Sequence, residues 1–327
     1  MERLSSDKKP QRTLSLSRFS LKLSPRNYPL SPRHSPKNSP KHSPTSSDLR
    51  TPRSPVSPKQ VQKIKLISKG GMGVEVWKVK LDGWVCCAKI IDITYSRESE
   101  VICFQKEIEI LKTLPSQNKH IIQYLGFQNT GRQIEIFTAL YDGSLQEQIK
   151  DRNLHDIPFT IKEIVDIAHQ IISALVVLHI RKLIHRDIKS ANILYEEICE
   201  EQTTTNYILG DFGESKIISK PTKTVTGTNR WMAPEIIFTE TGYSFEADMW
   251  SFGMLLYELM SLEIPYYEIT HGFGAEKRIM EGKLPSLTLK QKDDYASLID
   301  IWEACLISDP KKRLTAPGCL FRLQKLL

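Results

Sequence analysis

The pattern of hydrophobic and polar positions divides the chain after Gln60 into two regions. Up to Thr138, short runs rich in β-branched and aromatic residues alternate with turn residues, which predicts β-strands in "VQKIKLIS", "EVWKVKLDG" and "VCCAKIIDI". One run there, "EVICFQKEIEILKTL", has helical spacing instead. Beyond Thr138, long periodic segments such as "IKEIVDIAHQIISALVVLHIRK" and "DMWSFGMLLYELMSL" predict helices. We therefore expect an α+β fold, with a small β-rich lobe at about residues 61–138 and a larger helical lobe at residues 142–327.

The first 60 residues have a different composition. They hold ten of the eighteen prolines, many serines and only two aromatic side chains, so they cannot bury enough apolar surface to offset the entropy of ordering. They also hold 13 lysines and arginines against three acidic residues, a charge of +10 in a chain of +7, which leaves −3 on residues 61–327. We predict a disordered basic tail at residues 1–60, and the globular part gives no reason to expect a nucleic-acid groove.

The cysteines and the apolar runs bear on location. The six cysteines form no C-x-x-C pair and no disulfide-like spacing, which favours a reducing compartment. No run of eighteen apolar residues occurs, and "MERLSSDKKP" has neither an apolar signal core nor a glycine for myristoylation. These features favour a cytoplasmic protein, with the nucleus as the alternative, and they argue against a membrane partner.

Two later segments concentrate polar groups among apolar neighbours, "LIHRDIKSANIL" at residues 183–194 and "YILGDFGESK" at residues 207–216. A buried carboxylate is costly unless a cation meets it, yet any one of Asp187, Asn192 and Asp211 alone could be a turn residue. Together, H-R-D-x-K-x-x-N followed by D-F-G resembles the catalytic and metal-binding loops of the eukaryotic protein kinases. The resemblance covers residues 61–327 and implies the two-lobed protein-kinase fold, ATP and Mg²⁺ as cofactors, and protein substrates.

The resemblance implies a role for each polar residue of these two loops. Asp187 is expected to accept the proton of the substrate hydroxyl, and Lys189 to steady the transferred phosphate. Asn192 and Asp211 are expected to hold Mg²⁺ against the phosphate oxygens. Phosphoryl transfer of this kind depends on position and charge more than on covalent chemistry.

Further residues that match the family's motifs imply that the nucleotide lies between the smaller lobe and a hinge. Lys89 in "VCCAKII" corresponds to the family's strand lysine, which contacts the α- and β-phosphates. Its expected partner is Glu107, at the edge of the apolar stripe of the first helix, whereas Glu109 points to solvent. Thr138 takes the gatekeeper position. The hinge whose backbone would read adenine comprises Ala139, Leu140 and Tyr141.

The segment "ISKGGMGVEVWK" resembles a glycine-rich phosphate loop with two departures. Ser68 replaces the first glycine of G-x-G-x-x-G, and the run to the following valine is one residue longer than in the family pattern. Alone, such a segment is more often a hairpin, but beside the other motifs it is predicted to cover the phosphates, with Gly70 and Gly73 nearest to them. The predicted ATP-binding positions in this loop are Ile67, Ser68, Lys69, Gly70, Gly71, Met72, Gly73, Val74, Glu75 and Val76.

The segments after D-F-G are expected to carry regulation and structural support. Arg186 precedes the catalytic aspartate, a position from which the family binds a phosphate on the activation segment. The candidate acceptors in "KPTKTVTGT" are Thr222, Thr224 and Thr226. Glu235 is expected to pair with Arg313, and Asp248 to brace the catalytic loop through backbone N–H groups, both as structural contacts. The long connection "YEEICEEQTTTN" is expected to be a surface loop.

The lysine in "HRDIKSAN" and Thr228 in "GTNRW" favour a signalling serine/threonine kinase, and "DIKSANIL" with "GTNRWMAPE" most resembles the tyrosine-kinase-like group. Two alternatives remain open. The altered glycine loop suits a pseudokinase scaffold that binds nucleotide weakly, and "SPRHSPKNSPKHSP" resembles the repeats of DNA-associated tails. We favour a regulated tail, because eight Ser/Thr-Pro pairs make it a target for a proline-directed kinase.

Overall fold

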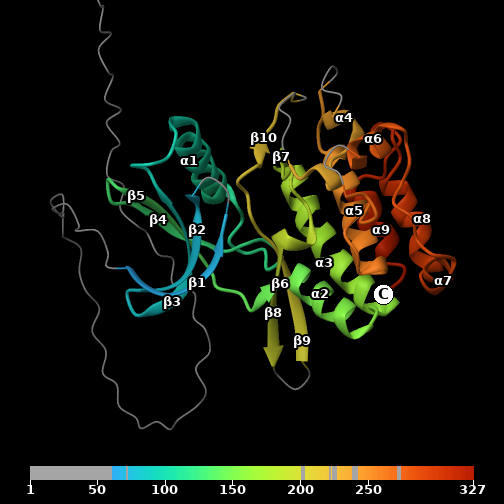
Figure 1. The fold of residues 1–327 in the computed structure, drawn as a ribbon, viewed down its shortest axis with the longest axis horizontal. Helices are drawn as coiled ribbons and strands as arrows, with labels where there is room; N and C mark the ends of the chain where they lie inside the picture. The colour runs from blue at the N-terminus through green and yellow to red at the C-terminus, as the bar shows by residue number, and fades with distance from the viewer. Residues whose placement is uncertain are drawn as a thin grey trace, which may run out of the picture.

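The computed structural model describes residues 61–70, 73–199, 203–220, 222, 227–237, 242–270 and 274–327. These residues form two lobes, one built on a β-sheet and the other mainly on helices (Figure 1). The α+β architecture expected from the sequence is therefore confirmed. The tail at residues 1–60 lies outside the described residues, so its predicted disorder stays a prediction.

The smaller lobe contains a five-stranded antiparallel sheet in the order β1-β2-β3-β5-β4. Its strands are β1 (Val61–Lys69), β2 (Glu75–Leu81), β3 (Trp84–Asp92), β4 (Tyr124–Asn129) and β5 (Gln133–Thr138). β2 and β3 join at Asp82 and Gly83, where φ values of 49° and 89° give the tight turn that Asp-Gly sequences favour. The single helix of this lobe, α1 (Glu98–Thr113), packs its apolar stripe into the main core.

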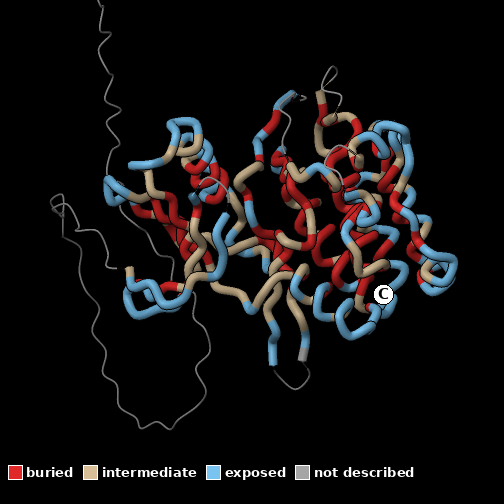
Figure 2. The backbone as a smooth tube through the Cα atoms, in the orientation of Figure 1, coloured by how far each residue is buried: buried red, intermediate tan, exposed pale blue. Residues whose placement is uncertain are grey.

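The larger lobe is helical and holds most of the buried residues (Figure 2). Its helices are α2 (Leu145–His155), α3 (Ile161–Ile180), α4 (Pro234–Ile237), α5 (Glu246–Ser261), α6 (Gly274–Met280), α7 (Leu289–Asp294), α8 (Ala296–Cys305) and α9 (Ala316–Leu323). The starts of α2 and α3 follow a local signal, because Ser144 with Glu147 and Thr160 with Glu163 form capping boxes.

Helix α3 passes a length-and-composition test for a membrane span. Ten of its residues are buried inside the lobe, among them Ile164, Ile171 and Leu175, and it packs against α5 and α9. A buried central helix of a globular domain passes the same test, so this helix does not change the expectation drawn from the sequence.

Short elements at the junction of the lobes hold the two polar motifs. These elements are β6 (Gly143–Ser144), β7 (Leu183–Ile184), β8 (Ile193–Cys199), β9 (Thr203–Leu209), β10 (Lys216–Ile217) and the 3₁₀ turns η2 (Ser190–Asn192) and η3 (Asn229–Trp231). The first motif loop connects β7 to β8 and the second connects β9 to β10. Because β8 pairs with β9 and β7 pairs with β10, the two loops lie next to each other.

The segment "YEEICEEQTTTN" is not the surface loop that we expected. Tyr195 to Cys199 and Thr203 to Asn206 extend β8 and β9 as an antiparallel hairpin that projects from the larger lobe (Figure 1). β-branched and aromatic residues in both arms suit paired strands, and Tyr195 lies opposite Tyr207. The expectation of a loop was wrong for the parts of this segment that the structure describes.

Candidate active site

One buried carboxylate binds the backbone of the first motif loop, which connects β7 to β8. Asp248, in the first turn of α5, accepts hydrogen bonds from the backbone N–H groups of His185 and Arg186 at 2.9 and 2.8 Å and contacts the His179 ring at 2.9 Å. Burial would raise the pKa of Asp248, but these partners outweigh it and lower that pKa, so the carboxylate stays ionised. Arg186 has a φ of 72°, an uncommon conformation for a residue with a side chain, and Asp248 stabilises this turn.

Asp187 lies at the centre of a hydrogen-bonded group. Its Oδ2 accepts from Lys189 Nζ at 2.6 Å and from Asn192 Nδ2 at 2.8 Å, and its Oδ1 accepts from Thr228 Oγ1 at 2.7 Å. Lys189 Nζ also donates to Thr228 Oγ1 at 2.6 Å. The structure thus brings together Asp187, Lys189 and Asn192, three residues that the sequence singled out, with Thr228 from a distant segment.

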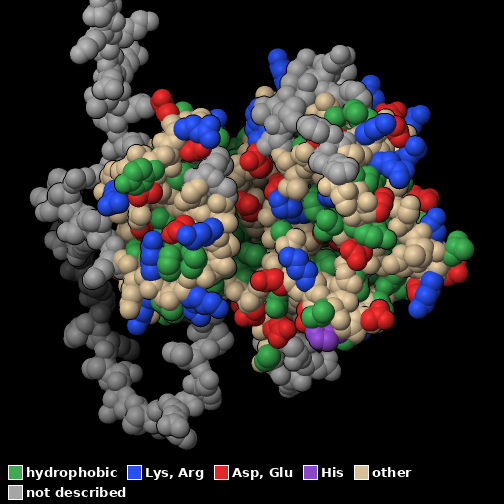
Figure 3. All heavy atoms as spheres, in the orientation of Figure 1, with side chains coloured by type: hydrophobic (Ala, Val, Ile, Leu, Met, Phe, Trp, Pro, Cys, Tyr) green, Lys and Arg blue, Asp and Glu red, His purple; other side chains and the backbone are tan. Residues whose placement is uncertain are grey.

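The second group joins the two lobes across the cleft. Lys89 Nζ, from β3, donates to both carboxylate oxygens of Glu107 in α1 at 2.8 and 2.9 Å, and to Oδ1 of Asp211 at 3.0 Å. Glu107 is buried, whereas the side chain of Asp211 remains 48% exposed in the cleft. Glu109, the rejected partner, is exposed and pairs with Lys112. Acidic side chains also line the hollow between the lobes in Figure 3.

These contacts set the charges of the second group. Burial alone would lower the pKa of Lys89, but the carboxylates of Asp211 and Glu107 outweigh it and raise that pKa, so the amine stays protonated. Burial would raise the pKa of Asp211, but the nearby Lys89 outweighs it and lowers that pKa to about 2. At neutral pH the protonated Lys89 amine and the ionised Asp211 carboxylate therefore lie side by side.

The residues present suit a divalent cation that is shared with a bound phosphate. Asp211 offers carboxylate oxygens and Asn192 an amide oxygen, and hard cations such as Mg²⁺ prefer such ligands. Within the described part of the chain, no group of three or more His, Cys, Asp or Glu side chains could enclose a metal ion. Mg²⁺ is commonly bound by one or two carboxylates together with phosphates and water, so this sparse ligand set fits it.

The glycine loop is a hairpin between β1 and β2 that faces the same cleft. The backbone N–H of Gly70 donates to the Val74 carbonyl at 2.7 Å, and Gly73 has a φ of 71°. Ser68 pairs with Val76, and Val76 pairs with Lys89. Directly opposed residues share a face of a sheet, so all three lie on the cleft side. Gly71 and Met72 lie outside the described residues.

Strand β1 has a bulge just before the glycine loop. The pairing passes from Leu66 opposite Trp77 to Ser68 opposite Val76, so Ile67 is bulged out of the ladder and half exposed. The side chain of Glu75 bonds to Trp77 at 2.9 Å and lies 3.4 Å from that of Lys69. The side chains of Ile67, Lys69 and Glu75 therefore do not turn inward toward Lys89.

The end of the cleft nearest the hinge is lined by residues opposite each other on β3 and β5. Thr138 pairs with Cys87, which lies two residues before Lys89 and therefore on the same face of β3. The sequence did not single out Cys87, although its spacing from Lys89 in a predicted strand could have shown it. The backbone N–H of Ala139 donates to the Gln123 carbonyl at 2.9 Å, and Leu140 follows it in the link to the larger lobe.

One of the predicted regulatory threonines is part of the folded structure. Thr222 is buried, exchanges two backbone hydrogen bonds with Tyr243, and accepts a bond from Lys216 Nζ at 3.0 Å. Arg186 donates to the Tyr243 hydroxyl at 3.4 Å and to the Glu214 carbonyl. Among the residues that the structure describes, Lys216 therefore contacts Thr222, and Arg186 contacts the Tyr243 that pairs with it. Thr224 and Thr226 lie outside the described residues.

An ion pair lies outside the two groups described above. Arg313 donates to both carboxylate oxygens of Glu235 at 2.6 and 2.9 Å, the pairing expected from the sequence.

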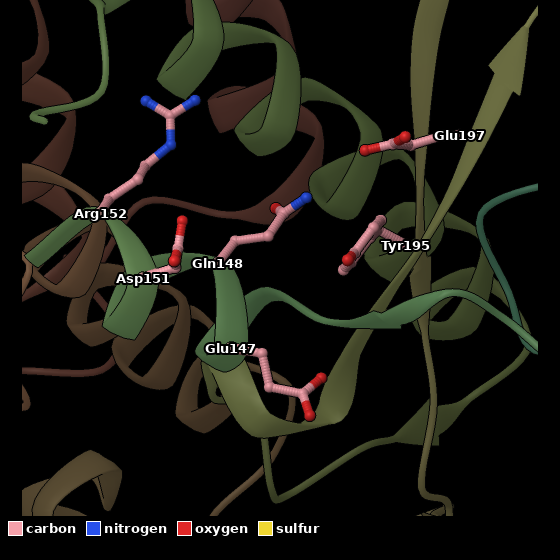
Figure 4. Close-up of a pocket in the computed structure, with 6 residues that line it drawn as sticks. All are labelled: Glu147, Gln148, Asp151, Arg152, Tyr195 and Glu197. Carbon is pink, nitrogen blue, oxygen red and sulfur yellow. The ribbon is translucent and has the colours of Figure 1, made fainter. Parts of the chain in front are cut away.

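An open cavity of about 410 Å³ beside α2 and β8 includes none of the predicted site residues (Figure 4). It is lined by Glu147, Gln148, Asp151, Arg152, Tyr195 and Glu197.

Comparisons with known proteins agree with this geometry. Residues 61–322 match the family model described as "Protein kinase domain". The chain is similar to "Kinase and exchange factor for Rac B" of Dictyostelium discoideum, with 33% identity over 280 residues, 82% of this chain and 24% of that protein. From the same organism, "Probable serine/threonine-protein kinase nek3" is 32% identical over 263 residues (77% and 22%), and "Serine/threonine-protein kinase pakF" is 32% identical over 242 residues (71% and 18%). The chain spans about a quarter or less of the length of these relatives.

Proposed function

The chain belongs to the protein kinase family, and from that premise we propose that it transfers the γ-phosphate of ATP to serine and threonine hydroxyls of proteins. The observation that carries the proposal is the set of contacts on Asp187, whose carboxylate is bound by Lys189, Asn192 and Thr228. The relatives named as serine/threonine kinases support the choice of acceptor. The "DIKSANIL" and "GTNRWMAPE" motifs support our placement in the tyrosine-kinase-like group.

The proposed roles follow from position. Asp187 accepts the proton of the acceptor hydroxyl, because its carboxylate lies at the centre of the bonds from Lys189, Asn192 and Thr228. Lys189, already bonded to Asp187 and Thr228, supplies positive charge where charge builds up on the transferred phosphate. Lys89, held by Glu107, binds the phosphates that precede the transferred one.

Asp211 and Asn192 are the residues that would hold Mg²⁺. When bound, the ion neutralises charge on the phosphate oxygens. The low pKa of Asp211 keeps its carboxylate ionised and ready to bind a cation. The glycine hairpin, with the Gly70 to Val74 backbone bond, would cover the phosphates and exclude water, while the hinge at Ala139 and Leu140 would bind the base.

The test is incubation of the purified chain with Mg-ATP and an acceptor protein, followed by mass-spectrometric mapping of phosphosites. We expect phosphoserine and phosphothreonine from the native chain. Asp187→Asn, Lys89→Met and Asp211→Asn should each lower turnover by at least ~10²-fold. If the native chain and all three variants show the same background, the activity is refuted and a pseudokinase scaffold, the reading that Ser68 suggests, replaces it.

We propose that phosphorylation near Thr222 regulates this activity. Lys216 contacts Thr222 and Arg186 contacts its partner Tyr243, so a phosphate there would form charge-assisted hydrogen bonds with these cations. Because Thr222 is buried, it must become exposed before a kinase can modify it. A triple alanine variant at Thr222, Thr224 and Thr226 that keeps full activity after maximal phosphorylation would contradict this mechanism.

We propose that residues 1–60 form a charge switch written by a proline-directed kinase. Each phosphate adds about −1.5 to −2 charges, so eight phosphates would reverse the tail's charge of +10. Eight-site alanine and glutamate variants that behave alike in activity, localisation and partner retention would reduce the tail to a spacer. Salt-sensitive DNA retention by the native chain, lost in the glutamate variant, would instead favour nucleic-acid binding.

We also propose a cytoplasmic location, which the six free cysteines support. Fluorescence microscopy of the tagged chain would check it.

A further inference from the structure

A second buried carboxylate in α5 contacts the active site and has no role in the mechanism above. Glu258 is almost fully buried and accepts hydrogen bonds from two separate segments. From the catalytic loop, the Ser190 hydroxyl donates to its Oε1, and the Ser190 backbone N–H donates to its Oε2 at 3.2 Å. From η3, the Trp231 indole N–H donates to Oε2 at 2.8 Å. One carboxylate therefore joins the two segments.

Each of the two segments adjoins a residue that bonds to Asp187. Ser190 directly follows Lys189. Trp231 closes the η3 turn on Thr228, because its backbone N–H donates to the Thr228 carbonyl at 2.9 Å. Lys189 and Thr228 both bond to Asp187 and to each other. A shift of η3 relative to Ser190 would therefore separate Thr228 from Lys189.

Further bonds hold η3 from the same side. The Ser251 hydroxyl of α5 donates to the Trp231 carbonyl at 2.8 Å. Arg230 donates to the carbonyls of Pro265 at 3.0 Å and Ile269 at 2.6 Å, and also to that of Tyr266. All of these partners belong to the larger lobe. Lys89, which is assigned to the preceding phosphates, and its partner Glu107 lie on the smaller lobe and touch none of them in the bonds described above.

We infer that Glu258 is a positioning residue that sets the affinity of this domain for its protein substrate and leaves ATP affinity unchanged. It does so by holding Thr228 and Lys189 at the spacing that admits an acceptor chain. The inference rests on the proposed function, since it concerns the protein-binding side of the same site.

Two substitutions of Glu258 separate hydrogen bonding from charge and size. In Glu258→Gln, the amide oxygen can accept from Trp231 and from the Ser190 N–H, and the amide NH₂ can donate to the Ser190 hydroxyl, so every bond survives. In Glu258→Leu, two buried N–H donors lose their acceptor, which destabilises this arrangement. Trp231→Phe removes only the indole donor and keeps an aromatic ring in place.

The chain offers a matched control for Trp231→Phe. Trp302 in α8 is also buried, but its indole N–H has no hydrogen-bond partner within the part of the chain that the structure describes. Trp302→Phe therefore makes the same chemical change in the same lobe without breaking a bond. Any effect common to both variants reports on packing, and an effect confined to Trp231 reports on the bond to Glu258.

The experiment measures initial rates on the full chain with dephosphorylated casein as acceptor, varying casein and ATP separately. We expect Glu258→Leu to raise KM for casein at least ~10-fold and Trp231→Phe about 3- to 10-fold, with KM for ATP within about twofold of the native value. Glu258→Gln and Trp302→Phe should stay within about twofold for both substrates. Equal increases in the two KM values, or a casein KM that does not respond to Glu258→Leu, would overturn the inference.

A second measurement keeps the inference testable if Glu258→Leu fails to fold or the native chain transfers no phosphate. Hydrogen exchange of the η3 amides depends only on local structure, and the Trp231 and Met232 N–H groups bond to Thr228 and Asn229 at 2.9 and 3.3 Å. Faster exchange of these amides in Trp231→Phe, but not in Trp302→Phe, supports the role of Glu258 even if the proposed activity fails. Unchanged exchange in Trp231→Phe refutes it.

Discussion

Replacing Glu107 by glutamine should impair the use of ATP strongly, because it changes the charge beside Lys89 without changing the shape of the side chain. Glu107 accepts two bonds from Lys89 Nζ, at 2.8 and 2.9 Å. Glutamine keeps one acceptor oxygen, while its NH₂ group must face the ammonium. One charge-assisted bond is lost and the other becomes a bond to a neutral amide. Lys89 would then move toward Asp211, its remaining anionic partner among these residues, and compete with the cation for that carboxylate.

The size of the effect follows from the burial of the pair. A hydrogen bond to a charged group contributes about 1.5–3 kcal/mol, and the side chain of Lys89 is 25% exposed, so the lower half of that range applies. Since about 1.4 kcal/mol corresponds to a factor of ten, kcat/KM for ATP should fall roughly 10- to 50-fold.

The assay is initial-rate phosphate transfer at varied ATP and saturating acceptor, with Glu109→Gln as the matched control. Glu109 lies on the same helix, is 72% exposed and pairs with Lys112 at 2.7 Å, a surface pair that contributes about 0–1 kcal/mol to stability. We expect its kcat/KM within about twofold of the native value. If Glu107→Gln also stays within twofold, Lys89 does not depend on Glu107, and our assignment of the phosphate-binding lysine is wrong.

Three further predictions concern stability, pH and the glycine loop. Glu235→Gln leaves the buried Arg313 guanidinium without its anion and should lower the free energy of unfolding by about 3 kcal/mol, as measured by urea denaturation. A loss below ~0.5 kcal/mol would mean that the backbone carbonyls bonded to Arg313 are enough to stabilise its buried charge. Burial raises the pKa of Glu258 to about 7, so the folded state retains a proton that the unfolded state releases at lower pH, and native stability should fall as pH rises toward 7. Glu258→Gln should therefore become more stable relative to the native chain between pH 5 and pH 8, and a constant difference would contradict this. Ser68→Gly should change KM for ATP less than about threefold, because Ser68 is paired as an ordinary strand residue, and a larger loss would show that its side chain matters.

The sequence determined most of the fold and of the candidate active site. The alternation of apolar positions predicts the strands and helices, because each element must present a regular face to the core. Asp187, Lys189 and Asn192 lie within six consecutive residues, so a local motif suffices to identify them. Glu107 was also predictable, because helical periodicity distinguishes it from Glu109, and the structure shows Glu107 bonded to Lys89.

Tertiary structure alone decided how distant segments meet. Glu258 lies 68 residues from Ser190 and 27 from Trp231, and no periodicity links positions so far apart. The bulge at Ile67 depends on how β1 pairs with β2, and the burial of Thr222 depends on its pairing with Tyr243. Local sequence specifies which face of an element is apolar and which residues form a motif. Packing in three dimensions determines which buried polar groups become partners, because each such group must find a donor or acceptor wherever the fold places one.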